Sequence, residues 1–251
     1  MTTASTHRLG EVGSTNDELL QLASRGAPSG TAVAAERQTA GRGRRGRAWL
    51  SPVGQHVYVS ILWRPPASLA TGEVAGVTLD VGLAVADVLT RLGVDAWVKW
   101  PNDVWVGERK IAGILSELHD AGVVLGIGVN VNVTADRMPD DIRDIATSMA
   151  IALGRESDRD AVLDDIVIAV RAACDQYAAR GGPDTARYAS RCITLGRRVR
   201  VEGKDGEAVG IARDGSLLVL FDATLAASAS ATPERVVAGD VELGPIASVP
   251  R

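Results

Sequence analysis

The spacing of apolar residues predicts three helices in the first three quarters of the chain. Apolar positions recur at helical intervals from Ser14 to Arg25, from Glu73 to Leu92 and from Arg159 to Tyr177, and glycine follows each stretch closely. Thr15 and Glu18 have the spacing of a capping box, so the first helix is expected to begin near Ser14. A short fourth helix is expected around residues 184–190.

Short apolar runs bounded by turn residues predict strands between these helices. The run His56 to Trp63 is apolar at nearly every position, which indicates a central strand that is covered on both faces. Four later runs are joined by tight turns, so they predict an antiparallel meander. The expected strands cover residues 31–36, 56–63, 96–100, 104–106, 110–118 and 123–133.

The pattern changes after about residue 193, where short β runs alternate with Gly and Asp turns. These runs cover residues 197–202, 207–212, 217–221 and 236–243. We therefore expect an α+β protein with a mixed, largely antiparallel sheet, helices packed on one face, and a small C-terminal β-barrel domain. The expected division is residues 1–190, residues 193–245, and a disordered tail at 246–251.

Composition narrows the class of protein. The chain has 251 residues, 46% of them hydrophobic, and a net charge of −4, which suits a globular protein and argues against non-specific nucleic-acid binding. Cys174 and Cys192 fit neither a redox nor a zinc spacing. No apolar run has the length of a membrane span, and the N-terminus has no signal-peptide pattern. These features predict a cytoplasmic protein with no membrane or nucleic-acid partner and no metal site.

One cationic stretch stands out against this mildly acidic background. Residues 41–47 hold four arginines and three glycines, and Trp49 follows. Guanidinium groups resist burial unless they are paired, and their donors match carboxylate and phosphate oxygens two at a time. Glycines let backbone N–H groups approach the same anion. The stretch therefore predicts a flexible loop that closes on an anion. We call residues 41–49 the arginine loop.

Three other interpretations of the arginine loop are weaker. Gly41, Gly43 and Gly46 match the spacing of a dinucleotide fingerprint, but that motif needs a helix to follow, and Pro52 and Gly54 follow here. An RNA-binding arginine/glycine segment would be expected to interleave more aromatic residues. A solvated loop without a role leaves the cost of ordering so many glycines unexplained.

A second cationic group follows the longest of the early helices. Lys99 and Lys110 are expected on neighbouring strands of a hairpin, and Gly113 removes a side chain where a ligand could approach the sheet. Two fixed ammonium groups and a mobile arginine loop would bracket a polyanion.

Taken together, these segments resemble the catalytic domain of the biotin protein ligases, the biotin–[acetyl-CoA-carboxylase] ligases. The resemblance runs over roughly residues 8–150 in family order and spacing, and a weaker stretch at 237–241 resembles the C-terminal barrel of the family. The segments that carry it are Gly13-Ser14-Thr15-Asn16, Glu36-x-Gln38-Thr39-Ala40 leading into the arginine loop, Lys99-Trp100-Pro101-Asn102-Asp103, Lys110-x-Ala112-Gly113-Ile114-Leu115 and Gly126-Ile127-Gly128-Val129-Asn130-Val131-Asn132.

The resemblance implies an enzyme of the class II synthetase and biotin–lipoate ligase fold. Such an enzyme activates biotin with ATP and Mg²⁺ to biotinyl-5′-AMP, releases pyrophosphate, and transfers biotin to one lysine of a biotin carboxyl carrier domain. It also implies the short form, because little chain precedes the first motif and no N-terminal DNA-binding domain is visible. No tightly bound metal is expected, and a homodimer is possible. A lipoate or octanoate protein ligase of the same architecture is the enzymatic alternative.

The resemblance also assigns roles to residues. Lys110, Arg42, Arg44 and Asp103 are the expected catalytic residues, with Lys110 the chief one because it would touch both the biotin carboxylate and the phosphate. The expected biotin-binding residues are Ser14, Thr15, Asn16, Gln38, Gly41, Arg42, Gly43, Arg44, Trp49, Lys110 and Gly113. The expected ATP- or adenylate-binding residues are Arg42, Arg44, Arg45, Gly46, Arg47, Trp49, Lys99, Asn102, Lys110 and Asn130.

Overall fold

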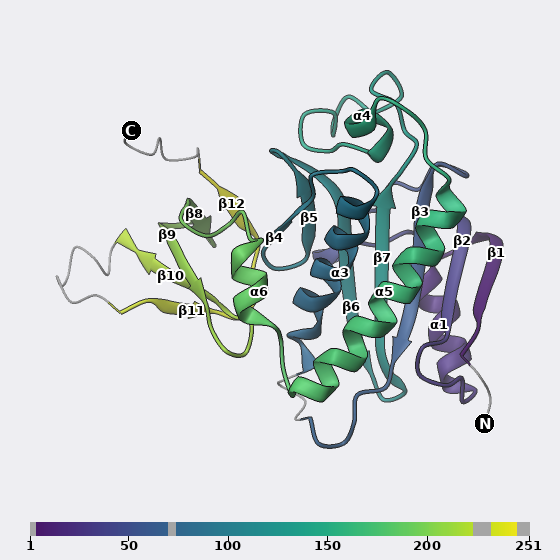
Figure 1. Ribbon diagram of the computed structural model, residues 1–251, viewed down its shortest axis with the longest axis horizontal. Coiled ribbons are helices and arrows are strands. Elements are labelled where there is room, and N and C mark those ends of the chain that lie inside the picture. Colours follow the sequence, from purple (N-terminus) through teal and green to yellow (C-terminus); the bar gives the residue numbers. More distant parts are fainter. Residues whose placement is uncertain (1–3, 70–73, 223–231, 245–251) are drawn as a thin grey trace.

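A seven-stranded mixed sheet forms the body of the protein (Figure 1). The computed structural model describes residues 4–69, 74–222 and 232–244. The first two strands are parallel, and all other neighbours in this sheet are antiparallel. Its spatial order is β1 (Thr6–Val12), β2 (Ala32–Gln38), β3 (His56–Trp63), β7 (Gly122–Asn130), β6 (Arg109–His119), β5 (Asp103–Val106) and β4 (Trp97–Lys99). The predicted α+β class, the mixed sheet and the meander from β4 to β7 are confirmed.

The main hydrophobic core lies between one face of this sheet and two long helices. Helix α3 (Val77–Arg91) packs on α5 (Arg159–Arg180), and both cover the sheet (Figure 1). All eight positions of β3 are buried, so the prediction of a central strand is confirmed. Alternate residues of β3 point into this core, and Trp63 meets Tyr177 there edge to face. We call this the core face.

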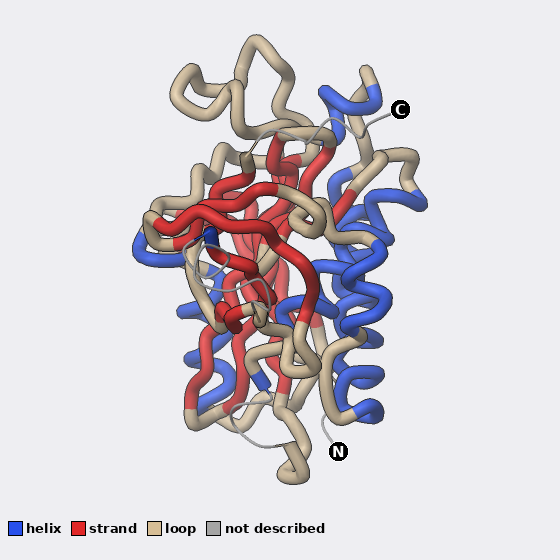
Figure 2. The backbone as a smooth tube through the Cα atoms, turned by 90° about the vertical axis from the view of Figure 1, so that its left-hand side faces the viewer, coloured by secondary structure: helices blue, strands red, loops and turns tan. Residues whose placement is uncertain are grey.

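Helix α1 (Thr15–Ser24) lies on the opposite face, which corrects the prediction that the helices pack on one face. Its Leu19 and Ala23 form a separate small cluster with Val33, Leu62 and Val124. Figure 2 shows helices on both sides of the strands. The cause is the two-residue period of the strands, which gives both faces of β2, β3 and β7 apolar positions to cover. We call the α1 side of the sheet the site face.

Strand β1 and helix α4 (Met149–Leu153) are among the described elements that were not predicted. Strand β1 is exposed along most of its length, and its sequence is mostly polar, so it lacks the apolar alternation of a half-buried strand. Helix α4 is too short to show helical periodicity, although Ser148 caps it by accepting a hydrogen bond from the Ile151 amide.

The C-terminal strands form a second, five-stranded sheet. Its order is β11 (Glu234–Val236), β10 (Leu217–Phe221), β9 (Lys204–Ile211), β8 (Arg198–Val201) and β12 (Val241–Leu243). Helix α6 (Thr185–Ser190) precedes it, as predicted. The run predicted as one strand at 236–243 is two strands separated by a turn at Gly239. Among the described residues β11 and β12 do not pair, so the sheet is open there, and the predicted tail at 246–251 lies outside the described residues.

The two sheets are joined by buried contacts. The indole N–H of Trp100 donates to the Gly215 carbonyl oxygen at 2.9 Å, and the main core includes Val199, Leu217 and Val219 of the second sheet. The domain boundary near residue 190 therefore stays a prediction.

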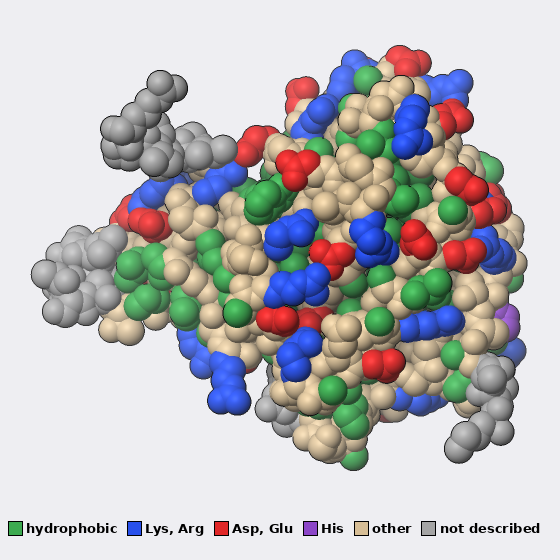
Figure 3. Space-filling view, viewed as in Figure 1, with side chains coloured by type: hydrophobic (Ala, Val, Ile, Leu, Met, Phe, Trp, Pro, Cys, Tyr) green, Lys and Arg blue, Asp and Glu red, His purple; other side chains and the backbone are tan. Residues whose placement is uncertain are grey.

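Charges of both signs intermix on the helix-covered face (Figure 3). Arg180 pairs there with the buried Asp80 of α3, and Arg187 pairs with Asp87 of the same helix. Of the helices in the described residues, none combines the length and apolar character needed to cross a membrane.

Candidate active site

Three glycines form a flat floor on the site face. Gly113 of β6 pairs with Gly128 of β7, and Gly126 lies two residues before Gly128 on the same strand face. A Cβ atom on Gly128 would lie 2.5 Å from the Trp49 ring, and one on Gly113 would lie 3.1 Å from it. A Cβ atom on Gly126 would collide with the Asn16 amide. The glycines therefore allow Trp49 and Asn16 to lie directly on the sheet. In the sequence, Gly126 and Gly128 stand out only as residues of a family motif.

A hydrogen-bonded polar group lies beside this floor. Thr15 directs its backbone N–H (2.8 Å) and its hydroxyl (3.1 Å) to Gln38 Oε1. The Ser60 hydroxyl lies 2.7 Å from Thr15 Oγ1 and 2.5 Å from Asn16 Oδ1. We call Thr15, Asn16, Gln38 and Ser60 the polar patch. Ser60 was not predicted, because it lies within a strand whose apolar neighbours suggest only a structural role.

The start of α1 supplies most of the polar patch. Ser14 is the N-cap residue, in an extended conformation, but its side chain makes no capping hydrogen bond. The side-chain oxygen Oε1 of Gln38 accepts the hydrogen bond of the Thr15 amide instead, so the capping box suggested by Thr15 and Glu18 is absent at this helix start. A side chain from the end of β2 thus ties the N-terminus of α1 to the strand that leads into the arginine loop.

The arginine loop is fastened on two sides. Arg42 forms a double hydrogen bond with Asp17 of α1 at 2.8 and 2.6 Å, and these bonds hold the pKa of the Asp17 carboxyl below its usual value. Arg44 reaches the other way and donates to Asn102 Oδ1 at 3.0 Å and to the Gly239 carbonyl oxygen at 3.3 Å. The loop therefore crosses the site face from α1 to the second sheet.

The remaining arginines of the loop face the second sheet. Arg47 donates to Asp240 at 2.8 Å, and Arg45 lies 3.6 Å from Glu202 and 3.7 Å from Asp240. Arg45 has a φ of 56° within the turn η1 (Arg44–Gly46), and Gly46 follows it with a φ of 73°. The adenylate-binding roles predicted for Arg45, Gly46 and Arg47 stay predictions.

A β-bulge places Lys110 on the site face. Val104 pairs with Ala112 and Trp105 with Lys110, so Ile111 is an extra residue in β6. Ile111 and Ala112 are both fully buried, and Lys110 is turned to the same side as Gly113. The Lys110 ammonium lies 5.3 Å from the centre of the Trp49 ring and 2.6 Å from Asp103 Oδ1. Lys110 thus stands where the glycine floor meets the charged part of the site.

Lys99 and Lys110 lie on either side of Asp103. Strand β5 separates their strands, which corrects the prediction that they are on neighbouring strands. Asp103 pairs with Lys99 of β4 and with Gly113 of β6 in the sheet register. Burial lowers the pKa of Lys99, Asp103 opposes that shift, and Lys110 adds to it. Burial likewise lowers the pKa of Arg44. We call Lys99, Asp103, Lys110, Arg44 and Asn102 the charged cluster.

Asn130 differs from the other predicted residues because its side chain is bound to a neighbouring backbone segment. It is buried on β7, and its amide donates to the Thr147 carbonyl oxygen at 2.9 Å. The Thr147 amide in turn donates to the Lys110 carbonyl oxygen at 2.8 Å. Asn130 therefore holds the segment that runs beside Lys110, and its contact with a nucleotide stays a prediction.

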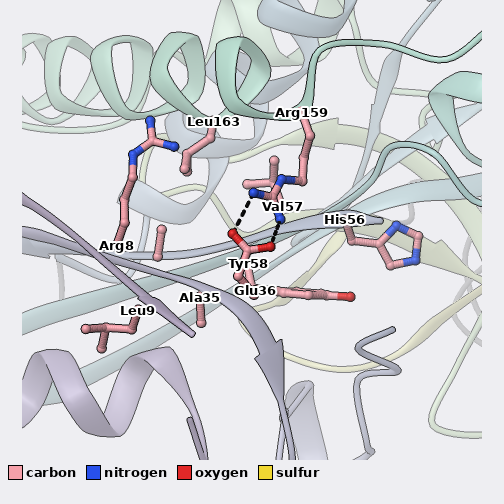
Figure 4. A pocket seen from close by; sticks show the side chains of 10 residues that line it. Arg8, Leu9, Ala35, Glu36, His56, Val57, Tyr58, Arg159 and Leu163 are labelled. Atoms are coloured by element: carbon pink, nitrogen blue, oxygen red, sulfur yellow. Dashed lines mark hydrogen bonds and ion pairs between the residues drawn. The ribbon is translucent and has the colours of Figure 1, made fainter. Parts of the chain in front are cut away.

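A small pocket lies at the base of the arginine loop, where β2 and β3 separate (Figure 4). Arg159 of α5 binds both oxygens of Glu36 there, at 2.5 and 2.7 Å. Burial lowers the pKa of the neighbouring His56 from 6.5 to about 4, and its Nδ1 accepts a hydrogen bond from the Val131 amide. Tyr58 donates to the Pro52 carbonyl oxygen at 3.0 Å. These contacts anchor both ends of the chain segment that carries the loop.

Comparison with known proteins gives a consistent result. Residues 9–133 match the model of the biotin/lipoate A/B protein ligase family. The chain is 32% identical over 244 residues to the bifunctional ligase/repressor BirA of Bacillus spizizenii, covering 93% of this chain and 72% of that protein. It is 36% identical over 210 residues to the biotin–[acetyl-CoA-carboxylase] ligase of Mycobacterium tuberculosis, covering 81% of this chain and 77% of that protein.

A solved structure is similar over almost the whole chain. The biotin protein ligase from Aquifex aeolicus in complex with biotin and ATP has a TM-score of 0.80 and 29% sequence identity. The similarity covers 96% of this chain and 98% of that one.

Proposed function

Because the chain belongs to the biotin/lipoate A/B protein ligase family, we propose that it is an ATP-dependent biotin protein ligase. It activates biotin to biotinyl-5′-AMP and transfers biotin to a lysine of a biotin carboxyl carrier domain. The Mycobacterium tuberculosis relative and the Aquifex aeolicus structure are named as biotin ligases, which favours biotin over the lipoate alternative and over an RNA-binding module.

The position of Lys110 is the observation that carries this proposal. Its ammonium lies against Trp49 at the edge of the glycine floor and also contacts Asp103 of the charged cluster. An acid with an apolar body that lies on the floor would bring its carboxylate to Lys110. The triphosphate of ATP would meet the same ammonium from the side of Lys99 and Arg44.

The first step joins two anions, so the site has to offset charge. A carboxylate oxygen of biotin attacks the α-phosphorus of ATP, the bond to the bridging oxygen breaks, and pyrophosphate leaves. Negative charge builds on the phosphate oxygens, and we assign its stabilisation to the cations Lys110, Lys99 and Arg44. At about 4 Å and an effective dielectric near 20, one such contact contributes about 4 kcal/mol before desolvation is counted.

The second step uses the same place. The amine of the acceptor lysine attacks the acyl carbon of the mixed anhydride, the bond from that carbon to the phosphate oxygen breaks, and AMP leaves. The acceptor ammonium loses two protons as it becomes an amide nitrogen: in this proposal the Asp103 carboxylate takes the first once Lys110 has turned to the adenylate, and the departing phosphate of AMP takes the second. Arg42 and Arg44 cover the adenylate from the arginine loop and limit its exposure to water.

Mg²⁺ enters with ATP in this proposal. Within the described ranges no three His, Cys, Asp or Glu side chains are grouped to hold a metal ion. Magnesium commonly binds one or two carboxylates together with substrate phosphates. Asp103 and Asn102 are the candidate protein ligands, and the ion would neutralise phosphate charge.

The carrier partner, the cellular location and the oligomeric state extend the same proposal. The acceptor is a biotin-dependent carboxylase, and the enzyme works in the cytoplasm without a nucleic-acid or membrane partner, either alone or as a homodimer. Size-exclusion chromatography with light scattering gives the oligomeric state.

The direct test is ATP–pyrophosphate exchange with purified protein. We expect exchange with biotin and none with lipoate, followed by a gain of one biotin mass on a carrier domain in mass spectrometry. Exchange that depends on lipoate, or oligonucleotide binding without any exchange, would overturn the proposal in favour of one of the alternatives.

A further inference from the structure

The side chain of Glu117 connects the polar patch to the arginine loop. It projects from β6 on the site face, and 29% of it is exposed. Its Oε2 atom accepts a hydrogen bond from Asn16 Nδ2 at 2.5 Å and lies 3.8 Å from Arg42 Nη2. A single carboxylate oxygen therefore contacts both a residue on the glycine floor and the first arginine of the loop.

Glu117 also fixes the orientation of the Asn16 amide. A carboxylate can only accept hydrogen bonds, so it selects the NH₂ group of Asn16. The other end of the amide, Oδ1, then faces the Ser60 hydroxyl at 2.5 Å. Rotating the amide by half a turn would set two oxygens against each other at Glu117.

This orientation sets the direction of the hydrogen bonds in the polar patch. Ser60 has one hydroxyl proton, and Asn16 Oδ1, which cannot donate, takes it. The Thr15 hydroxyl can give its own proton to Ser60 Oγ at 2.7 Å or to Gln38 Oε1 at 3.1 Å. Thr15 Oγ1 is then left with lone pairs for a ligand. The patch accepts hydrogen bonds from N–H groups, such as those of the biotin ureido ring.

We propose that Glu117 is a positioning residue for the ring end of the site. Through Asn16 and Ser60 it makes Thr15 an acceptor for ring N–H groups. Beside Asp17, which holds Arg42 at 2.6 Å, it gives the closed arginine loop a second carboxylate. The proposal rests on the biotin ligase function proposed above, and it adds a residue that neither the sequence motifs nor that mechanism uses.

Glu117→Gln tests the proposal, because it keeps the size of the side chain and removes its charge. The glutamine can turn an NH₂ group toward Asn16 and allow either amide orientation. We expect the Kd of biotin, measured by isothermal titration without ATP, to rise about tenfold. The KM of ATP in pyrophosphate exchange should stay within about twofold, and the melting temperature should be unchanged. Glu117→Asp keeps the anion and should bind biotin more tightly than Glu117→Gln.

Glu11→Gln is the matched control, because Glu11 is also a strand carboxylate paired with an arginine, Arg37 at 2.9 Å, but lies at the β1 edge of the sheet. Glu11→Gln should leave the Kd of biotin and the KM of ATP unchanged. Unaltered biotin binding in Glu117→Gln overturns the proposal. A Glu117→Gln variant in which the Kd of biotin and the KM of ATP rise together and the melting temperature falls overturns it as well, since Glu117 would then be structural. Wild-type protein without biotin-dependent exchange would instead defeat the proposed function.

Discussion

The two faces of the large sheet are built from the same strands but do different work. On the core face, residues such as Ile111, Ile127 and Val129 fill the space under α3 and α5, and each is almost fully buried. On the site face the same strands carry Gly113, Gly126, Gly128 and Lys110. Neighbouring residues of one strand therefore contribute either to stability or to the site. Substitutions at adjacent positions should affect either the stability of the fold or the activity.

The largest effect is expected from the pair Lys110 and Ile111, which point to opposite faces. Lys110→Ala should lower adenylate formation by about 100- to 1000-fold, because it removes a cation that faces the developing charge, and should leave the fold intact. Ile111→Ala should lower the free energy of unfolding by about 2–5 kcal/mol and change the KM of biotin little. Pyrophosphate exchange and urea unfolding measure the two effects.

Lys204→Ala serves as the lysine control, because Lys204 lies in the second sheet over Phe221. It should retain exchange activity. If Lys110→Ala kept most of its activity, the two faces would not divide function as described.

His56 lines the small pocket at the base of the arginine loop. Its burial leads to a prediction about how stability depends on pH. Its pKa is about 4 in the folded protein because of burial, against 6.5 ordinarily, so the unfolded chain binds the proton first. Stability is therefore full above about pH 6.5 and falls as the pH drops toward 4, by about 3 kcal/mol from this group.

His56→Asn can still accept the Val131 hydrogen bond but cannot be protonated. Urea unfolding at pH 7.5 and pH 4.5 should show a smaller difference for this variant than for wild type. His7→Asn, at an exposed histidine, should behave as wild type. An equal loss of stability in His56→Asn and wild type would contradict the prediction.

Gly128→Ala tests the floor of the site face. The new methyl group would lie 2.5 Å from the Trp49 ring, so the ring must move off the sheet. We expect the KM of biotin to rise about tenfold, since small displacements of binding groups are costly. Gly10→Ala, where a methyl group meets nothing within 4 Å, is the control. Unchanged kinetics in Gly128→Ala would show that the glycine floor has no role in binding.

The smallest effect is expected at the second sheet, outside the two faces. Asp240→Asn removes the carboxylate that binds Arg47 and approaches Arg45. Both contacts are partly exposed, so the change should be modest: about threefold faster trypsin cleavage in the arginine loop and a similar rise in the KM of ATP. Asp222→Asn, which breaks the pair with Arg198 in the same sheet, should do neither. Equal cleavage rates in the two variants would show that Asp240 does not hold the arginine loop.

Local patterns were enough to predict much of the fold. The strand His56–Trp63, the meander and the helix of residues 159–177 follow from periodicity and turn residues, and the structure confirms them. Strand β1 was missed because parallel pairing with β2, not its own sequence, holds it in place. The prediction that the helices pack on one face was wrong for α1. Both faces of the central strands are apolar, so periodicity alone does not show which face a helix covers.

The site was predictable in its residue types but not in its geometry. The arginine loop and Lys99 to Lys110 mark the site through their composition. The orientation of Lys110 depends on a one-residue bulge that has no signal in the sequence, and the roles of Ser60 and Glu117 depend on contacts between residues distant in sequence. The assigned roles in binding and catalysis stay predictions.

The hydrogen bond from Trp100 to the Gly215 carbonyl has a consequence for how the protein melts. Trp100 is buried directly after strand β4, and the Gly215 carbonyl oxygen that accepts its N–H lies in a turn of the second sheet. Separating the two sheets would break that hydrogen bond and expose to water a core to which both sheets contribute. Scanning calorimetry should therefore record one heat-absorption peak for the whole chain. A version of the protein cut at residue 190 should lose the active conformation together with its second sheet.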